Sequence, residues 1–452
     1  DAANVDTVIA TASGALGAAI GVVTNIITTD HSTGVVVTGT STDKSSLTGT
    51  SVSVDADAKE GISSLLIAAS GAQYAAVSAS VNVNRQLSDV SAAVDQTEVL
   101  DSFAQNANYL GRITTSAITA AGSQYAAVPI SVVINYADNA VSSSVAHSIL
   151  RAEGQSASVG ANRISEFSSL NVTASGAMYG AVAGLVNVNT IEGATSAEVN
   201  DSEVKAGQFS VNAENEDHLK VTDVTATGAI GSLGASVVVS YFKGSSAANL
   251  RNSIVTADKL TVSSLQDHYV NGTVAFASGG IGTIGANVFS LVIGSGDNPF
   301  ASNRQDLGSA EDTVNKYLSD YASSGTGSLG FITENDELTQ EEKDKIVGSA
   351  AAADASVSSG SGNGTSVVVS GNYLTVGSSD VSVKEDSKAG SIDVTLGSGS
   401  AGAGVLAASV ITLRRHYNNK VNLSGNTITS KDNFNVLNSL EGKTNLEAIQ
   451  TS

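Results

Sequence analysis

The stretch ASGAQYAAVSASVNVN, residues 69–84, decides the fold that this sequence predicts. After Tyr74 it alternates strictly, with Val or Ala at odd positions 77–83 and Ser or Asn at even positions 78–84. A period of two sends alternate side chains to opposite faces of a β-strand. We therefore predict a half-buried strand in which valines such as Val81 enter a thin core.

The same stretch recurs along the chain as an internal repeat. Its marker glycine lies at positions 14, 71, 122, 176, 228 and 279, at spacings of 57, 51, 54, 52 and 51 residues, and a further copy centres on Gly399. Stacked strands in repeats of this kind predict an all-β, parallel β-helix (β-solenoid). Because a coil commonly needs roughly twenty to thirty residues, we expect about two coils per repeat and about fifteen coils, stacked into a rod of roughly 70–80 Å.

Four columns of the repeat keep their residue type, and we interpret them as structural positions. Because copies two coils apart would not touch, we expect the Asn column in turns or in ladders with intervening residues. We expect the Tyr column to be structural too, although exposed ring rows would also suit a partner. The columns are Tyr74, Tyr125 and Tyr179; Val81, Val132, Val186 and Val238; Asn84, Asn135 and Asn189; and Thr97, Ser148, Ser202 and Ser253.

Composition narrows the function classes. Of 452 residues, 41% are hydrophobic and 14% charged, a balance that predicts a folded chain. The net charge of −21 and the absence of any Lys/Arg-rich run argue against a nucleic-acid partner. With no Cys, the chain has no disulfides, thiolate metal sites or Cys nucleophiles. The opening DAANVDTVIA has no initiator Met and no basic region, which predicts a mature fragment.

Residues 297–346 lose the alternation and become acidic, which predicts a mainly helical insertion between solenoid repeats at 1–296 and 347–452. Ser309 followed by Glu311 has the pattern of a helix N-terminus, and apolar residues then recur at three- and four-residue spacing from Val314 to Tyr321. A second short helix is expected after the capping box that begins at Thr339.

Catalytic and metal-binding patterns are weak, and we predict no enzyme, no cofactor and no metal site. The dipeptides Asp217-His218 and Asp267-His268 lie one repeat apart, which is more typical of a turn than of an active site. The G-x-G-x-x-G matches at Gly280, Gly325 and Gly397 are expected by chance in a chain with 45 Gly. A polysaccharide-acting enzyme would have to use Arg414, Arg415 and His416, which have no acidic motif beside them.

Repeats such as ASGAMYGAVAGLVNVN (174–189) followed by ATSAEVNDSEVKAGQFSVNA (194–213) resemble those of filamentous-haemagglutinin-like exported adhesins. These adhesins include the leukotoxin-type filamentous proteins of anaerobic Gram-negative bacteria. The resemblance covers most of the chain outside residues 297–346. It implies a right-handed parallel β-helix, export through an outer-membrane transporter, and attachment to cells or surfaces. No secretion domain is recognisable at the N-terminus and no toxin domain at the C-terminus, so the chain resembles a stretch of stalk.

The sequence therefore predicts a structural and adhesive rod, secreted or displayed on the bacterial cell surface, that mediates attachment or forms extracellular fibres. Its partners would be an unidentified host-cell or surface receptor and, through end-to-end self-association, other copies of itself. The alternative is a membrane-damaging, leukotoxin-like cytotoxin. This alternative is suggested by uncharged alternating segments such as residues 62–84, which are long enough to span a bilayer.

Overall fold

The computed structural model describes residues 2–294, 364–385, 391–416 and 418–451, which form only strands and the segments between them. Two sheets contain all of the strands, and every strand pairing in them is parallel. The prediction of an all-β parallel solenoid is confirmed. The predicted helical insertion at residues 297–346 lies outside the described residues.

In the described part of the chain, the two sheets have thirteen and nine strands. Sheet A consists of β1 (Ala2–Ala15), β3 (Ser45–Leu47), β4 (Ser51–Ala72), β6 (Thr97–Val99), β7 (Ser102–Ser123), β9 (Ile149–Gly176), β11 (Glu203–Gly228), β13 (Ile254–Gly279), β16 (Tyr373–Glu385), β17 (Ser391–Ala401), β20 (Thr427–Ser430), β21 (Phe434–Leu440) and β22 (Lys443–Thr451). Sheet B consists of β2 (Ala18–Thr38), β5 (Ala75–Asp95), β8 (Ala126–Ala146), β10 (Gly180–Asn200), β12 (Gly231–Arg251), β14 (Gly282–Gly294), β15 (Gly364–Ser370), β18 (Gly404–His416) and β19 (Lys420–Ser424).

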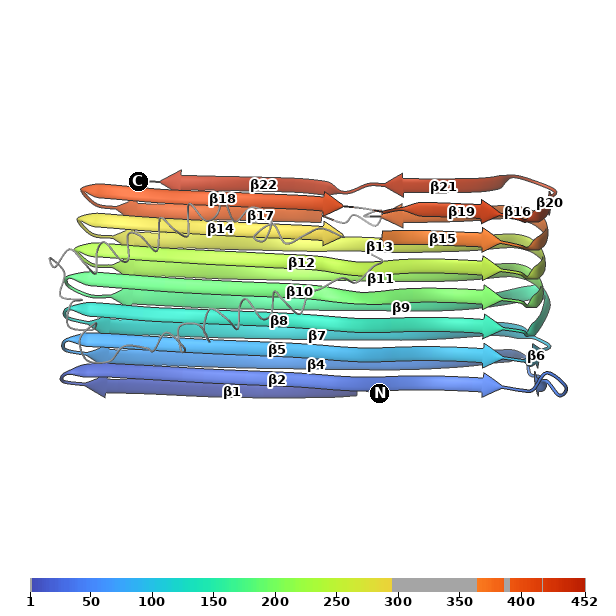
Figure 1. Ribbon diagram of the computed structural model, residues 1–452, viewed down its shortest axis with the longest axis horizontal. Coiled ribbons are helices and arrows are strands. Elements are labelled where there is room, and N and C mark those ends of the chain that lie inside the picture. The colour runs from blue at the N-terminus through green and yellow to red at the C-terminus, as the bar shows by residue number, and fades with distance from the viewer. Residues whose placement is uncertain (1, 295–363, 386–390, 417, 452) are drawn as a thin grey trace.

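One coil of the solenoid is one long strand of sheet A, a short turn, one long strand of sheet B and a second turn (Figure 1). Successive coils pair directly, with Gly71 opposite Gly122 in sheet A and Asn84 opposite Asn135 in sheet B. Both pairs are 51 residues apart, so one repeat is one coil. The prediction of two coils per repeat is wrong because β4 and β5 have 22 and 21 residues, about four times the usual strand length.

These long strands give the molecule the shape of a slab. Sheet A stacks eight levels, from β1 to β20, which at about 4.8 Å per level makes the stack about 38 Å high. A strand of 21 residues extends about 70 Å at 3.3 Å per residue. The longest dimension therefore follows the strands, as Figure 1 shows, and not the stacking direction that the sequence had predicted.

Two rows of turns close the coils. We call the row that leads from sheet A to sheet B the tyrosine edge, because Tyr74, Tyr125 and Tyr179 lie in it, and it is on the left of Figure 1. We call the opposite row, which leads from sheet B back to sheet A, the serine edge, because Ser148 and Ser202 lie in it.

The interior is apolar toward the serine edge. There, short Val and Ala side chains such as Val211 and Ala161 form one buried cluster with the rings of Phe103 and Phe209. A second apolar cluster, which includes Ile113 and Phe167, occupies the middle of the slab. This is the thin core of mostly small side chains that the composition predicts.

Toward the tyrosine edge the alternation has the opposite sense from the one predicted. Ser78, Ser80, Asn82 and Asn84 of β5 are buried in the interior, whereas Val81 and its valine neighbours are half-buried on the outer face. The prediction that Val81 enters the core is wrong. Alternation fixes which residues share a face but not which face is inside, and here the buried polar groups find partners in the opposite sheet.

The valine column is also not one column. Val132 and Val186 pair on the outer face in line with Val81, but their partner in β12 is Val237, so Val238 faces the interior. The turn before β12 is one residue shorter than the turn before β10. Residues that lie the same number of positions after the marker glycine therefore differ by one position along β10 and β12, and they point to opposite faces.

In two levels of the described sheet B, two shorter strands replace the one long strand: β14 and β15 in one level, β18 and β19 in the next. β14 ends at Gly294 and β15 begins at Gly364, and both strands pair with β12, at Phe242 and at Ser245 respectively. Gly294 and Gly364 have φ values of 88° and 147°, which are open to glycine but rarely to other residues. The described residues after Gly364 continue the same two sheets.

Candidate functional site

The Asn column is a direct ladder in the interior of sheet B. Asn84 Nδ2 donates to Asn135 Oδ1 at 3.0 Å, and Asn135 Nδ2 donates to Asn189 Oδ1 at 2.9 Å. All three side chains are buried, so the expected turns or intervening residues are wrong. Because one repeat is one coil, identical amides stack at the strand spacing and bond along the axis as the backbone does.

Cross-sheet hydrogen bonds hold the two sheets together around this ladder. Asn84 Nδ2 also lies 2.9 Å from Thr115 Oγ1, and Ser80 Oγ lies 2.6 Å from Thr119 Oγ1. Both threonines belong to β7 of the facing sheet, and both are buried. Short polar side chains let the sheets approach, and their mutual bonding offsets the cost of removing them from water.

The Tyr column forms an aromatic ladder on the tyrosine edge. Rings of Tyr74 and Tyr125 stack with centroids 5.4 Å apart, and those of Tyr125 and Tyr179 with centroids 5.3 Å apart. The backbone bonds of the turns continue the row through Ile230 and Ile281, both exposed. The sequence missed these two positions because their residue type differs, although their place beside the marker glycine could have identified them.

The Thr/Ser column is a hydrogen-bonded ladder inside the serine edge. The Ser148 hydroxyl accepts from the Thr97 amide at 3.1 Å, and the same bond joins Ser202 to the Ser148 amide. The residue before each hydroxyl residue has a φ of 48° to 50°, which is the left-handed region of the backbone. Asn, Asp and Gly adopt this region most easily, and His147 also adopts it here. Asn372 and Asn426 extend the ladder, and the sequence missed both because Asn replaces the hydroxyl residue there.

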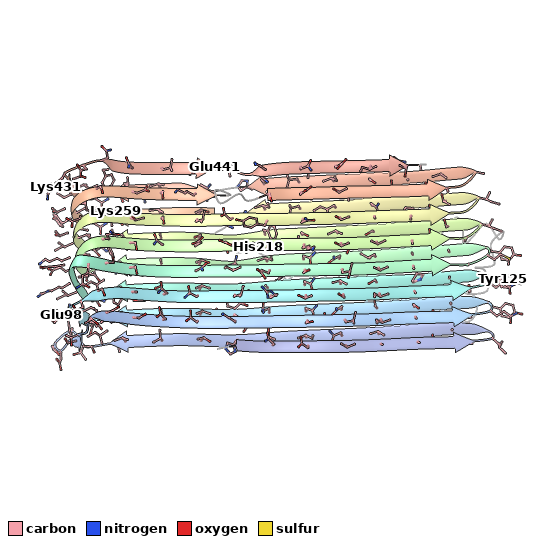
Figure 2. All side chains as sticks on the ribbon, turned by 180° about the vertical axis from the view of Figure 1, so that it is seen from behind. Glu98, Tyr125, His218, Lys259, Lys431 and Glu441 are labelled. Atoms are coloured by element: carbon pink, nitrogen blue, oxygen red, sulfur yellow. The ribbon has the colours of Figure 1, made fainter. Side chains whose placement is uncertain are left out.

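Charged side chains gather toward the serine edge. Lys44 Nζ donates to the His147 carbonyl at 2.9 Å, and His147 Nδ1 lies 2.9 Å from Asp95 Oδ1. Figure 2 places Glu98 and Lys431 at this edge and Tyr125 at the opposite one. Exposed polar contacts of this kind contribute little stability, and what they determine is the polarity of this edge.

The middle of the interior contains a closed ionic network. Arg163 Nη2 lies 2.9 Å from Asp217 Oδ1, Arg163 Nε donates to Asn215 Oδ1 at 2.8 Å, and Arg163 Nη1 donates to the Glu192 carbonyl. These side chains are fully buried. Gly244 gives the guanidinium room, since a Cβ there would lie 2.5 Å from Arg163 Nη2. The network is placed to fix the sheets relative to each other, and its burial keeps solutes away.

The two Asp-His dipeptides are not equivalent. Asp217 pairs with His268 across β11 and β13, because the dipeptides are 50 residues apart while the strand register is 51. Asp217 and His268 therefore both face the interior, where Asp217 Oδ2 and His268 Nε2 are 4.0 Å apart, and His218 lies on the outer face. The interpretation of these pairs as one repeated turn position is wrong.

A second buried carboxylate lies near this network. Glu60 Oε2 accepts hydrogen bonds from the hydroxyls of Ser88 at 2.6 Å and Tyr109 at 3.2 Å. Burial, together with the negative charge of Glu60, raises the pKa of the Tyr109 hydroxyl far above its ordinary value, although the Ser88 bond opposes this. Tyr109 is therefore neutral and acts as a hydrogen-bond donor.

The basic triplet is divided by the strand. Alternation along β18 turns Arg415 toward the interior, where Nη2 donates to Thr444 Oγ1 at 2.8 Å, and turns Arg414 and His416 to the other face. The three side chains do not converge on one point. Among the described residues, no group of three or more His, Cys, Asp or Glu side chains is placed to hold a metal ion.

A polar groove of 380 Å³ crosses the outer face of sheet A in the middle of the slab. Arg112 and Glu166 form an ion pair on it, and next to them the rings of His218 and Tyr269 stack with centroids 4.4 Å apart. Figure 2 shows His218 midway between the two edges. Charged and aromatic side chains therefore meet on this part of the outer face.

Comparison with known proteins finds no matching family model, no matching curated protein and no matching solved structure. The resemblance to filamentous-haemagglutinin-like adhesins therefore stays a prediction. In the described part of the chain, no helix has the length and apolarity needed to cross a membrane.

Proposed function

We propose that the chain is a structural and adhesive part of a secreted or surface-displayed solenoid, which mediates attachment or forms extracellular fibres. The observation that supports this proposal is the set of ladders that run from coil to coil. The amides of Asn84, Asn135 and Asn189 bond in the interior. Inside the serine edge, the hydroxyls of Ser148, Ser202 and Ser253 each accept from a backbone amide of the preceding coil. Such a stack resists bending because each coil is bonded to its neighbours along its whole length.

The same ladders present outer side chains in straight rows. Asp55 and Asn106 bond at 2.8 Å on the outer face of sheet A, and Asp57 and Asn108 bond at 2.7 Å beside them. A surface that presents polar side chains at strand spacing can contact an extended partner at several levels at once. Attachment through many weak contacts gains its strength from their number.

Attachment is tested by adding the full chain, labelled with a fluorophore, to host leukocytes and to uncoated and protein-coated surfaces. We expect saturable retention on cells or on one of the surfaces, and electron micrographs of concentrated protein test for fibres. A chain that is retained nowhere and stays monomeric would contradict the proposal. Surface display and the outer-membrane transporter are tested separately by fractionating the producing bacterium.

A membrane-damaging cytotoxin is the second candidate, and one observation favours it. The uncharged segment at residues 62–84 recurs in other coils, each time centred on the tyrosine edge. The cell experiment separates the two candidates if cytosolic dye is measured alongside binding. Dye release at saturating binding would support the cytotoxin, and binding without release would support the adhesive rod.

A further inference from the structure

The tyrosine edge is the end of an uncharged half of the molecule. We use the word hairpin for the end of a sheet A strand, the turn at this edge and the start of the following sheet B strand. In each of the first seven coils, this hairpin lacks Asp, Glu, Lys and Arg. It extends for about ten residues or more along at least one of its two strands. On that side about 30 Å of strand separates the edge from the first charge, whereas on the shorter side of the fifth coil the buried Asp223 lies five residues before the end of β11. The hairpins are residues 7–29, 62–84, 113–135, 167–191, 224–242, 270–293 and 394–413.

The polarity of these hairpins is inverted relative to an ordinary soluble sheet. In β10, Asn187 and Asn189 are buried in the interior, while Val186 and Val188 lie on the outer face. Because each strand pairs in register with the next, these valines join rows that are apolar from β5 to β12, and Thr24, Ser290 and Thr412 are the polar members of the same rows in the outer coils. An outer sheet face that contacts only water normally carries polar side chains.

Three adjoining surfaces share this apolar character. The first is the ridge of the edge itself, where Met178 and Ile281 are 51% and 62% exposed beside the Tyr ladder. The second is a groove of 480 Å³ on the outer face of sheet B, lined by residues such as Leu233 and Ile284. The third is a shallow depression of 620 Å³ on sheet A, lined by a row of alanines that includes Ala120.

The three apolar surfaces adjoin one another around the edge, so a partner that covers all of them must surround the edge. A second copy of the chain could cover one outer face, but it would leave the ridge and the other face in water. An apolar phase covers all three together when the edge enters it. Tyr side chains suit the boundary of such a phase because their rings are apolar and their hydroxyls stay hydrated.

We propose that the tyrosine edge binds a zwitterionic lipid surface, with the ridge of Tyr74, Tyr125, Tyr179, Ile230 and Ile281 buried at the boundary between headgroups and acyl chains. The depth is that of an interfacial element, about 5–10 Å, because the groove and the depression are lined by residues within about four positions of the turns. Zwitterionic lipid is preferred because the chain carries a net charge of −21 and no Lys or Arg lies on the ridge. This proposal rests on the folded slab alone and does not depend on attachment to cells.

The test is flotation of the full chain with phosphatidylcholine vesicles. We expect the wild-type chain to float and binding to persist at high salt. Met178→Asp with Ile281→Asp places two charges on the ridge at exposed turn positions, and should lower the bound fraction at least tenfold. The matched control is Leu100→Asp with Ile254→Asp, which adds the same charge at the serine edge, where these residues are 41% and 54% exposed. The control should bind as the wild type does.

A spectroscopic readout separates insertion from loss of folding. The chain has no Trp, so Tyr125→Trp introduces a single reporter on the ridge and Tyr373→Trp a single reporter at the serine edge. Vesicles should shift the emission of the first to shorter wavelength and leave the second unchanged. The proposal is overturned if wild-type protein does not float, if both double variants lose binding equally, or if ultracentrifugation without lipid shows a dimer that only the ridge variant dissociates.

Discussion

Asp223 carries a titratable group into the uncharged half of the slab. Its carboxylate is fully buried and accepts hydrogen bonds from Asn171 at 2.7 Å and Asn187 at 3.2 Å. Burial raises the pKa of this carboxyl from 3.8 to about 7, although both hydrogen bonds oppose the shift. Between pH 4 and pH 7 the unfolded chain therefore releases a proton that the folded chain retains. This contribution makes folding less favourable as the pH rises through that range, and the loss is complete above pH 7.

Replacing this group by its neutral isostere tests the shift. We expect Asp223→Asn to raise the free energy of unfolding at pH 8 by up to about 4 kcal/mol, and to change it by less than about 1 kcal/mol at pH 4. Urea denaturation at the two pH values measures both differences. Asp89→Asn, at an exposed position of β5, is the control and should show no such dependence. Equal effects of Asp223→Asn at both pH values would contradict a raised pKa.

At the scale of the element, a strand in this fold has a polar inner row at one end and an apolar inner row at the other. Val186 of β10 lies on the outer face, half-buried, whereas Val211 of β11 is fully buried near the serine edge. The two valines are not told apart by the residue that follows, which is Asn187 in one case and Asn212 in the other. Their different environments follow from which half of the slab they occupy.

The same substitution at both valines tests this assignment. Val211→Asp puts an unpaired carboxylate into the core, and we expect it to reduce the free energy of unfolding by about 4 kcal/mol or more. Val186→Asp leaves the new charge in contact with water, so we expect a loss of only about 1 kcal/mol. Chemical denaturation of both variants gives the comparison. Similar losses at the two positions would show that Val186 faces the core after all.

At the scale of the whole molecule, stability is shared between neighbouring coils. Each coil touches only the one before and the one after it, so a complete coil is a removable unit. Because one coil is one repeat, we expect a deletion to be tolerated only when strands of sheet A and sheet B still alternate along the shortened chain. This distinguishes the observed coil of about fifty residues from coils of half that size.

Deletion of residues 97–147 removes one coil and joins Gln96 to Ser148, which occupies the column of Thr97. We expect a folded protein with a β-rich circular dichroism spectrum and a lower melting temperature, in which Asn84 meets Asn189. Deletion of residues 97–122 removes only β6 and nearly all of β7, so two sheet B strands would follow each other without a return strand. We expect that variant to be unfolded. A folded, equally stable product of the shorter deletion would contradict the coil assignment.

Much of the fold is determined by the sequence itself. The strict alternation of residues 77–84 requires a strand, the recurrence of Gly71 at Gly122 requires a repeat, and together they lead to a parallel solenoid. These signals are local or periodic, so they can be read without knowing which residues meet. The Tyr and Asn columns were found the same way, although their partners were not.

Only the tertiary structure decided which face of each strand is inside and how many residues complete one coil. Alternation is symmetric between the two faces, and the symmetry is broken when Asn84 and Thr115 bond across the sheets while Val81 stays outside. Coil length is equally hidden, because strands of 21 residues and pairs of shorter strands give the same period. Burial and pairing depend on contacts between distant residues, and it is these contacts that place an uncharged, apolar edge opposite a charged one.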